Sequence, residues 1–346
     1  MLRSTTLILI AAVWLAGFVP ALADDPIALR ITNMGVTPAH MPVVKVWAKN
    51  QSDAAYEGSV TLELPDGWTL DPAMKDVSLK PDETTSLSFT IHNGKTREDN
   101  RYEVTAIADG AGQVVRRSQQ VVAASVPYFK PEIDGKTDDW KDAIPVTFIT
   151  QGKKTTISTL WNRRQFSMLV VVEEDKWLPW SNSQEFDAVQ IAISPQDTMT
   201  STEAEDKATR YEYLLTSGGA GQGGRLFQLA EPGTKLGDTQ AERNLDELEI
   251  DDPKLAVWRE GITTYYEWGI SFRSLKKIRP SEGREFFLSV LVHDPDGTGV
   301  RDWGEAAGLW SCQRNRLAWS VWPGARWSDK MPMDNKVEWG MCSSKY

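Results

Sequence analysis

The chain has 346 residues, and its 48 acidic and 38 basic side chains give a formal net charge of −10 at pH 7. This acidic balance, without a basic patch that carries interleaved aromatic residues, disfavours nucleic acid and anionic lipid as partners. The length suggests two domains, and an acidic protein of this kind fits a neutral ligand.

The first residues have the pattern of a secretory signal. Arg3 supplies a positive charge, Leu7–Phe18 is an apolar stretch too short for a transmembrane anchor, and Ala21-Leu22-Ala23 is a small-x-small cleavage site. We therefore expect residues 1–23 to be removed. The mature chain, from Asp24, is expected to be secreted or to reside in the periplasm or cell envelope.

Residues 24–126 contain short segments with the period-two alternation of β-strands, separated by turns such as Pro65-Asp66-Gly67. About seven short strands in about 100 residues are typical of an immunoglobulin-like sandwich. The predicted strands are Ile27–Thr32, Val43–Lys49, Gly58–Leu64, Asp76–Leu79, Thr85–His92, Arg101–Ala108 and Gln113–Val122.

Two segments of this unit, Leu64–Trp68 and Val77–Thr84, resemble the NEW3-type immunoglobulin-like modules found beside bacterial glycosidase and sugar-binding domains. The resemblance implies a spacer without a binding site, with Trp68 in the core. Residues 127–131, Pro-Tyr-Phe-Lys-Pro, form a short, stiff linker. We expect the two units to fold separately when the chain is cut near Tyr128.

Residues 132–346 carry four motifs in order. They are Ile133-Asp134-Gly135 with Asp139-Trp140, Leu160-Trp161-Asn162 before the strand Met168–Asp175, Trp180 before Phe186–Ile193, and Tyr265–Trp268 before Phe287–Asp294. This order resembles the family 9 carbohydrate-binding module, a CBM9-like or DOMON-like domain. The resemblance implies a sandwich of two antiparallel sheets, so the whole chain is expected to be all-β with two sandwiches. Helical patterns are scarce, and only Ser271–Ile278 and the stretch Ala241–Asp251 suggest short helices.

The resembled family holds a terminal sugar between two tryptophans. These map onto Trp180 and Trp327, with Trp322 as the fallback for the second and Trp177 as a third platform. Polar side chains that could bind the sugar hydroxyls are Asp187, Gln190 and Glu212.

The polar residues depart from the family pattern. Gln190 stands where the family has an acid, Glu212 lies near the position of the family's arginine, and His293 replaces an asparagine. The loop Ser217–Gly224 has no counterpart in the motif. The stacking tryptophans are retained but the residues that orient a sugar differ, so the family's ligand preference does not carry over. A degenerate copy without a ligand is an alternative.

The run Asp294-Pro295-Asp296-Gly297 resembles an oxygen-rich calcium loop. Most such runs are simple turns, and a full EF-type loop needs more acids and a distal Glu. Members of the resembled family carry structural calcium, so Asp294 and Asp296 are candidate ligands. No other cofactor is expected, and Arg301 is expected to order this loop.

Cys312 and Cys342 are the only cysteines. In an exported chain we expect them to form a disulfide, and a metal site there is less favoured. The bond would fix the tryptophan-rich end of the chain, which holds Trp303, Trp310, Trp319, Trp322, Trp327 and Trp339. Most of these tryptophans, and Trp161 and Trp268 in strand patterns, are expected to be core residues.

Catalytic motifs are absent from the sequence: it has no nucleophile elbow, no zinc-protease motif and no phosphate loop. Glu173-Glu174-Asp175 is an acidic run, but successive strand residues face opposite sides and cannot flank one glycosidic bond. We therefore expect a non-catalytic protein that binds a saccharide. The alternatives are a haem-binding electron carrier with Met168 or His293 as an axial ligand, an envelope module that contacts only proteins, and a glycosidase.

Overall fold

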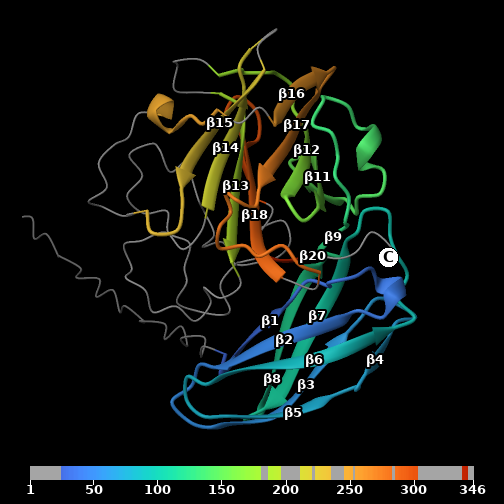
Figure 1. Ribbon diagram of the computed structural model, residues 1–346. Helices are drawn as coiled ribbons and strands as arrows, with labels where there is room; N and C mark the ends of the chain where they lie inside the picture. The colour runs from blue at the N-terminus through green and yellow to red at the C-terminus, as the bar shows by residue number, and fades with distance from the viewer. Residues whose placement is uncertain are drawn as a thin grey trace, which may run out of the picture.

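Figure 1 shows the computed structural model, in which the chain forms two β-sandwiches in succession. The structure describes residues 25–180, 186–195, 211–219, 223–234, 245–251, 254–282, 285–302 and 337–341. The signal segment, Cys312, Cys342, Trp322 and Trp327 lie outside these ranges. The strands confirm the all-β fold expected from the sequence.

The first sandwich packs one antiparallel sheet of four strands against another. The strands begin and end close to the predicted residues, and β4 is a short strand that the sequence did not indicate. The first sheet has the order β1 (Ile27–Ile31), β2 (Val43–Asn50), β6 (Thr84–His92) and β4 (Thr69–Asp71), and the second has the order β5 (Lys75–Leu79), β3 (Tyr56–Glu63), β7 (Tyr102–Gly110) and β8 (Gln113–Val121).

Alternating burial places one side of each strand in the core. In β2, Val44, Val46 and Ala48 are fully buried, while the residues between them are half-buried. Successive side chains of a strand point to opposite faces, so this pattern orients β2 with its apolar face toward the second sheet.

The turn before β4 depends on Gly67. Its φ of 82° lies in the left-handed region, which glycine adopts at little steric cost. The turn is closed by the Trp68 N–H, which donates to the Pro65 carbonyl at 3.2 Å. The half-buried Trp68 ring packs against the core and lies 5.1 Å from Tyr102.

The second sandwich packs a sheet of five described strands against a longer sheet. Neighbouring strands are antiparallel, except that β9 runs parallel to β20. The shorter sheet has the order β10 (Val146–Thr150), β11 (Lys153–Trp161), β12 (Gln165–Glu173), β17 (Thr263–Ser271) and β16 (Leu255–Glu260), and the longer one has β15 (Gly224–Ala230), β14 (Tyr211–Ser217), β13 (Ala188–Pro195), β18 (Glu285–Asp294), β20 (Val337–Met341) and β9 (Ser125–Val126), with β19 (Gly299–Asp302) paired to β18.

Trp161 and Trp268 lie in the core between these two sheets, as the sequence predicted. Their exposed fractions are 4% and 0%. Trp268 lies 5.1 Å from Tyr213 of the opposite sheet, so the two aromatic rings join the layers.

Helical structure in the described ranges is limited to single 3-10 turns, which are η1 (Pro38–His40), η2 (Asp138–Trp140) and η4 (Leu245–Leu248). The last lies within the acidic stretch that suggested a helix. Ser271–Ile278 is not a helix. It forms successive turns, in which the Ser274 and Leu275 N–H groups donate to the Ser271 carbonyl and the Ile278 N–H donates to the Leu275 carbonyl. Leu275 and Ile278 are buried in the core.

The segment between the sandwiches is built into the second one. Ser125 and Val126 pair with β20, and Val122 and Val126 belong to the core of the second sandwich. The Asn100 side chain donates to the Ala123 carbonyl at 3.0 Å and to the Pro145 carbonyl at 3.2 Å. The core of the second sandwich therefore begins before residue 127.

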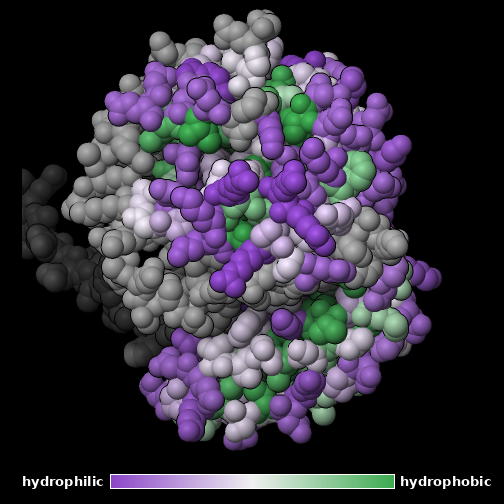
Figure 2. Space-filling model, in the orientation of Figure 1, coloured by the Kyte–Doolittle hydropathy of each residue, from purple (hydrophilic) through white to green (hydrophobic). Residues whose placement is uncertain are grey.

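Hydrophilic side chains cover most of the coloured surface of the upper, second sandwich in Figure 2, and hydrophobic side chains reach it only in separate patches. None of the helices in the described ranges is long and apolar enough to cross a membrane.

Candidate functional site

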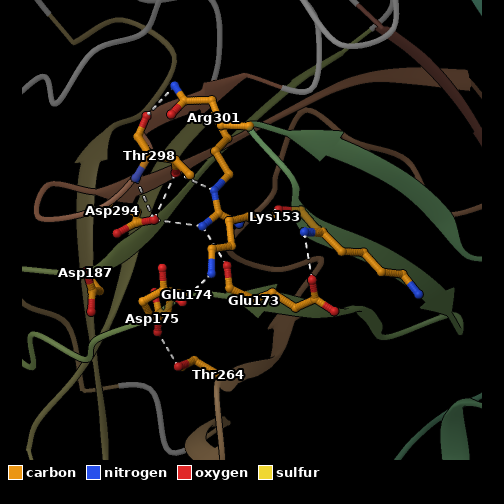
Figure 3. A network of polar contacts seen from close by, with 12 residues as sticks. Lys153, Glu173, Glu174, Asp175, Asp187, Thr264, Asp294, Thr298 and Arg301 are labelled. Atoms are coloured by element: carbon orange, nitrogen blue, oxygen red, sulfur yellow. Dashed lines mark hydrogen bonds and ion pairs between the residues drawn. The ribbon is translucent and has the colours of Figure 1, made fainter.

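Three buried carboxylates converge at one end of the second sandwich (Figure 3). Glu174 follows β12, Asp187 precedes β13, and Asp294 ends β18. One oxygen of each lies within 4.8 Å of the others, and the exposed fractions of the three residues are 0%, 1% and 2%. Burying this much negative charge is costly unless positive charge compensates it.

The strand pattern explains how these residues meet. Ala188 pairs with His293, so the residues that flank this pair, Asp187 and Asp294, are neighbours at the end of the longer sheet. Glu174 comes from the shorter sheet. It continues the buried alternation of Val170 and Val172, which directs its side chain between the two layers.

Arginine side chains compensate part of the charge. Arg259 donates to Glu174 Oε1 at 2.7 Å, and Arg301 donates to Asp294 Oδ2 at 2.8 Å. Thr264 also donates to Glu174, and Thr298 donates to Asp294 through its N–H and its hydroxyl. Arg301 thus orders the loop after β18, as the sequence suggested.

Several carboxylate oxygens of this cluster keep an unused lone pair. Glu174 Oε2 and Asp187 Oδ1 are buried and have no hydrogen-bond partner among the described residues, and the same holds for Asp296 Oδ1 in the loop after β18. An unsatisfied buried acceptor costs about 1–3 kcal/mol, and more when it is charged. Unpaired carboxylate oxygens of this kind are suitable ligands for a cation.

The pKa values of these carboxyls agree with this interpretation. Burial raises the pKa of Glu174 to about 7 and that of Asp187 to about 8. Burial acts in the same sense on Asp294, but hydrogen bonds from Thr298 and Arg301 outweigh it and hold its pKa below the usual value. A bound cation would stabilise the ionised forms of all three.

The donors fit calcium. All of them are oxygens, which hard cations prefer, and Ca²⁺ accepts an irregular set of six to eight. Asp294 and Asp296 were predicted ligands, whereas sequence reasoning missed Glu174 and placed Asp187 only against a sugar. The alternation Val170, Val172, Glu174 was the available signal, because it marks Glu174 as buried.

The loop that carries Trp177 and Trp180 is tied to this cluster. The Leu178 N–H donates to Asp187 Oδ2 at 2.6 Å, and the Asp187 N–H donates back to the Leu178 carbonyl at 2.8 Å. The Trp180 N–H donates to the Ser217 carbonyl at 2.8 Å. Asp187 therefore belongs to the buried carboxylate cluster and also fixes this loop.

Trp180 is half-buried and packs on one side against the sandwich. Its ring lies 4.7 Å from Phe186 and 5.3 Å from Phe227. The Arg225 guanidinium lies over the ring, 4.7 Å from its centroid, and is held by Glu249. Arg225 thus covers one face of the indole, and Phe186 and Phe227 also contact the ring, so only part of the half-buried indole is exposed.

Trp177 is also half-buried. Its indole Nε1 is buried and has no hydrogen-bond partner in the described part of the chain. Tryptophan N–H groups usually find an acceptor when buried, so this ring is held less completely than Trp180.

Gln190 and Glu212 lie on the outer face of the longer sheet, but both are buried, with exposed fractions of 1% and 0%. Gln190 Oε1 lies 3.1 Å from His293 Nε2. Burial lowers the pKa of His293 to about 3, so this ring is neutral at physiological pH. The structure therefore brings Gln190 and His293 together. Trp327, the second predicted stacking residue, lies outside the described residues.

Met168 and His293 belong to different layers. Met168 points into the core between the sheets, whereas Val292 occupies that side of β18 and His293 points away from it. The two side chains therefore do not face one metal ion, as a pair of axial haem ligands would.

The sequence matches no protein-family model and no curated protein. Among solved structures, it is similar to a family 9 carbohydrate-binding module from Caldicellulosiruptor kristjanssonii in complex with glucose, at 11% identity and a TM-score of 0.37, over 63% of this chain and 95% of that chain. The same module in complex with cellotriose gives 11% identity and a TM-score of 0.40, over 63% and 93%. Red sea bream transglutaminase gives 9% identity and a TM-score of 0.23, over 80% and 31%. Likenesses at this level identify no function.

Proposed function

We propose that the chain is an exported, non-catalytic protein whose second sandwich binds a neutral saccharide on loop tryptophans above a calcium site. The observation that carries this proposal is the tie between Asp187 and Leu178. It connects a buried carboxylate cluster to the loop with Trp177 and Trp180, the segment that the sequence singled out for sugar stacking.

Saccharides suit such a loop on physical grounds. A pyranose ring presents C–H groups to an aromatic face and hydroxyls around its rim. Trp180 supplies an aromatic face, and Arg225 and Glu249 supply a donor and an acceptor beside it. The net charge of −10 disfavours anionic ligands and favours a neutral one. Trp327 remains the proposed second platform.

The cation would be held by Glu174, Asp187 and Asp294, with Asp296 beside them. Calcium supplies positive charge that balances buried carboxylates. The residues of the chain do the positioning: Asp187 fixes Leu178, and Arg301 with Thr298 fixes Asp294. The ion therefore serves the geometry of the loop and takes no part in chemistry.

The first sandwich is proposed to be a spacer of the NEW3-type immunoglobulin-like class. The arrangement of acids supports a non-catalytic role for the second. Glu174 is buried and Asp175 is exposed, so these neighbours do not face one another across a substrate. Export rests on the pattern of residues 1–23.

Binding of the full mature chain to a glycan array and to immobilised neutral polysaccharides tests the proposal. We expect saturable retention by at least one neutral saccharide in calcium, and no release of reducing ends from any of them. Absence of binding to every neutral saccharide, or measurable hydrolysis, would contradict the proposed function.

A further inference from the structure

A row of half-buried side chains crosses the outer face of the five-stranded sheet, away from the carboxylate cluster. Strand pairing fixes the row, because each member lies directly opposite the next. The sheet spans about 19 Å in this direction, at about 4.8 Å between strands. In order, the row is Trp258, Tyr265, Val171, Thr156 and Thr147.

One side of this row is raised and the other is open. Ile133, Trp140 and Ala143 cover the adjacent part of the sheet, where Leu169 is buried. In Figure 1 this cover is the green segment beside β11 and β12. On the other side, Glu173 and Thr263 are half-buried, and Lys154, Ile149 and Glu260 are exposed. We call this row the ledge. The segment with Ile133, Trp140 and Ala143 borders it on one side, and more exposed side chains border it on the other.

The aromatic pair gives the ledge a stacking face. The rings of Trp258 and Tyr265 are parallel within 5°, with centroids 4.7 Å apart. This separation matches the distance between neighbouring strands, so the two rings stack face to face, one above β16 and the other above β17. Trp258 covers one face of Tyr265, and Val171 is the next residue of the row on the other side of Tyr265.

Polar groups continue the ledge beyond Val171. The Thr147 and Thr156 hydroxyls lie 3.0 Å apart, and each keeps capacity for another hydrogen bond. The Glu173 carboxylate, which accepts the Lys154 N–H at 3.0 Å, lies along the open side. Aromatic face, hydroxyls and carboxylate together match the C–H faces and hydroxyls of linked sugars, and Glu173 and Glu260 disfavour an anionic chain.

We propose that this ledge is a second saccharide-binding surface, which takes an internal stretch of a neutral polysaccharide lying across the strands. The inference rests on the proposed function only for the class of ligand. The ledge is on the outer face of one sheet, whereas Trp180 packs with Phe186 and Phe227 on the other sheet. The two surfaces therefore bind independently.

Val171→Phe tests the ledge without emptying it. The new ring would fill the space beside Tyr265 and occupy the position of the sugar. Cross-strand aromatic pairs stabilise sheets, so the variant should fold. Val114→Phe is the control, because it adds the same ring at an exposed valine of the first sandwich. The full chain and its variants are run in native gels containing soluble neutral β-glucan, xylan or mannan, and sedimented to report self-association.

Val171→Phe should weaken retardation by the bound polysaccharide at least about tenfold, or about 1.4 kcal/mol. Val114→Phe should behave as wild type, and binding of a short oligosaccharide at Trp180 should be unaffected by Val171→Phe. If Val171→Phe were retarded as the wild type is, the ledge would not bind the polysaccharide, but the proposed function would stand. A change in the oligomeric state of Val171→Phe without a change in polysaccharide binding would lead to the same conclusion. If only Trp180→Ala lost binding, the proposed function would stand without the ledge. If the wild type bound no neutral polysaccharide, the ledge would be refuted.

Discussion

Three buried carboxylates lie together in the second sandwich and form its candidate cation site. Glu174, Asp187 and Asp294 approach one another closely enough to bind one ion, and two arginines neutralise them only in part. Buried charges in proteins are paired or coordinate metals. Substitutions of single residues in this cluster can therefore test whether the protein binds calcium.

Asp187→Asn should remove the response of the protein to calcium. In the wild type, calcium at about 100 times its dissociation constant should add about 2.7 kcal/mol to the free energy of unfolding. Asn can still accept the Leu178 N–H, but it lacks the charge that the ion needs. Differential scanning calorimetry with calcium and with chelator measures the response.

Asp175→Asn is the matched control, since Asp175 is an exposed acid next to the cluster. It should respond to calcium as the wild type does. Equal calcium responses of Asp187→Asn and the wild type would show that the ion binds elsewhere.

The pH dependence of stability should change with calcium. Burial raises the pKa of Glu174 to about 7 and that of Asp187 to about 8, against about 4 in the unfolded chain. In chelator, the folded protein therefore binds more protons than the unfolded chain, and stability falls as the pH rises through those values. His293 has the opposite effect only below about pH 6.5, where the unfolded chain gains its proton.

Melting temperatures in chelator should therefore fall between about pH 6.5 and about pH 8. Calcium should reduce or reverse this slope, because the ion favours the ionised carboxylates. Glu174→Gln should flatten the slope in chelator. A melting temperature that rises with pH in chelator would contradict the assignment of raised pKa values to these carboxyls.

At the scale of single elements, the sequence predicted strands more fully than the site. The alternation in β2 and the Pro-Asp-Gly turns located the first sandwich closely, because period two and glycine geometry are local properties. Thr69–Asp71 was missed, since three residues are too short to show alternation. The proximity of Glu174 to Asp187 and Asp294 depends on the packing of two sheets, which no local pattern encodes.

The sequence also did not show that residues just before the linker belong to the second sandwich. Pro127–Pro131 marks a change of unit, but the alternation of β8 hides the contribution of Val122 and Val126 to the second core. Parallel pairing of β9 with β20 joins segments more than 200 residues apart, which sequence patterns do not report.

A fragment that starts at residue 128 should therefore be less stable than one that starts at residue 122. It loses two buried valines, each contributing about 1.5–3 kcal/mol. Urea unfolding followed by circular dichroism compares the two fragments. Identical midpoints would mean that β9 contributes nothing to the second sandwich, and that the chain can be divided near Tyr128 without loss.

At the scale of the whole molecule, Asn100 and β9 join the sandwiches at more than one point. The Asn100 side chain binds backbone on both sides of the linker, at Ala123 and Pro145. The two sandwiches therefore meet at a hydrogen-bonded joint, which restrains the first sandwich relative to the second.

We predict that the chain is exported and that Cys312 and Cys342 form a disulfide. They are the only cysteines, and exported chains mature in oxidising compartments. Titration of the unreduced, denatured protein with a thiol reagent should detect no free thiol. Detection of two equivalents of free thiol would refute the disulfide. If the disulfide is present, its reduction should lower the stability of the second sandwich.

Calorimetric titration of the full chain with its best saccharide, alongside Trp180→Ala, tests the central claim most directly. Trp180 is half-buried and is the proposed stacking residue of this loop, with Arg225 over one face of its ring. Losing it should cost about 1–3 kcal/mol of binding, or roughly tenfold or more in affinity. Trp68→Ala, a half-buried tryptophan of the first sandwich, should leave the affinity unchanged. If folded Trp180→Ala binds the saccharide as tightly as the wild type, the stacking site is not on this loop.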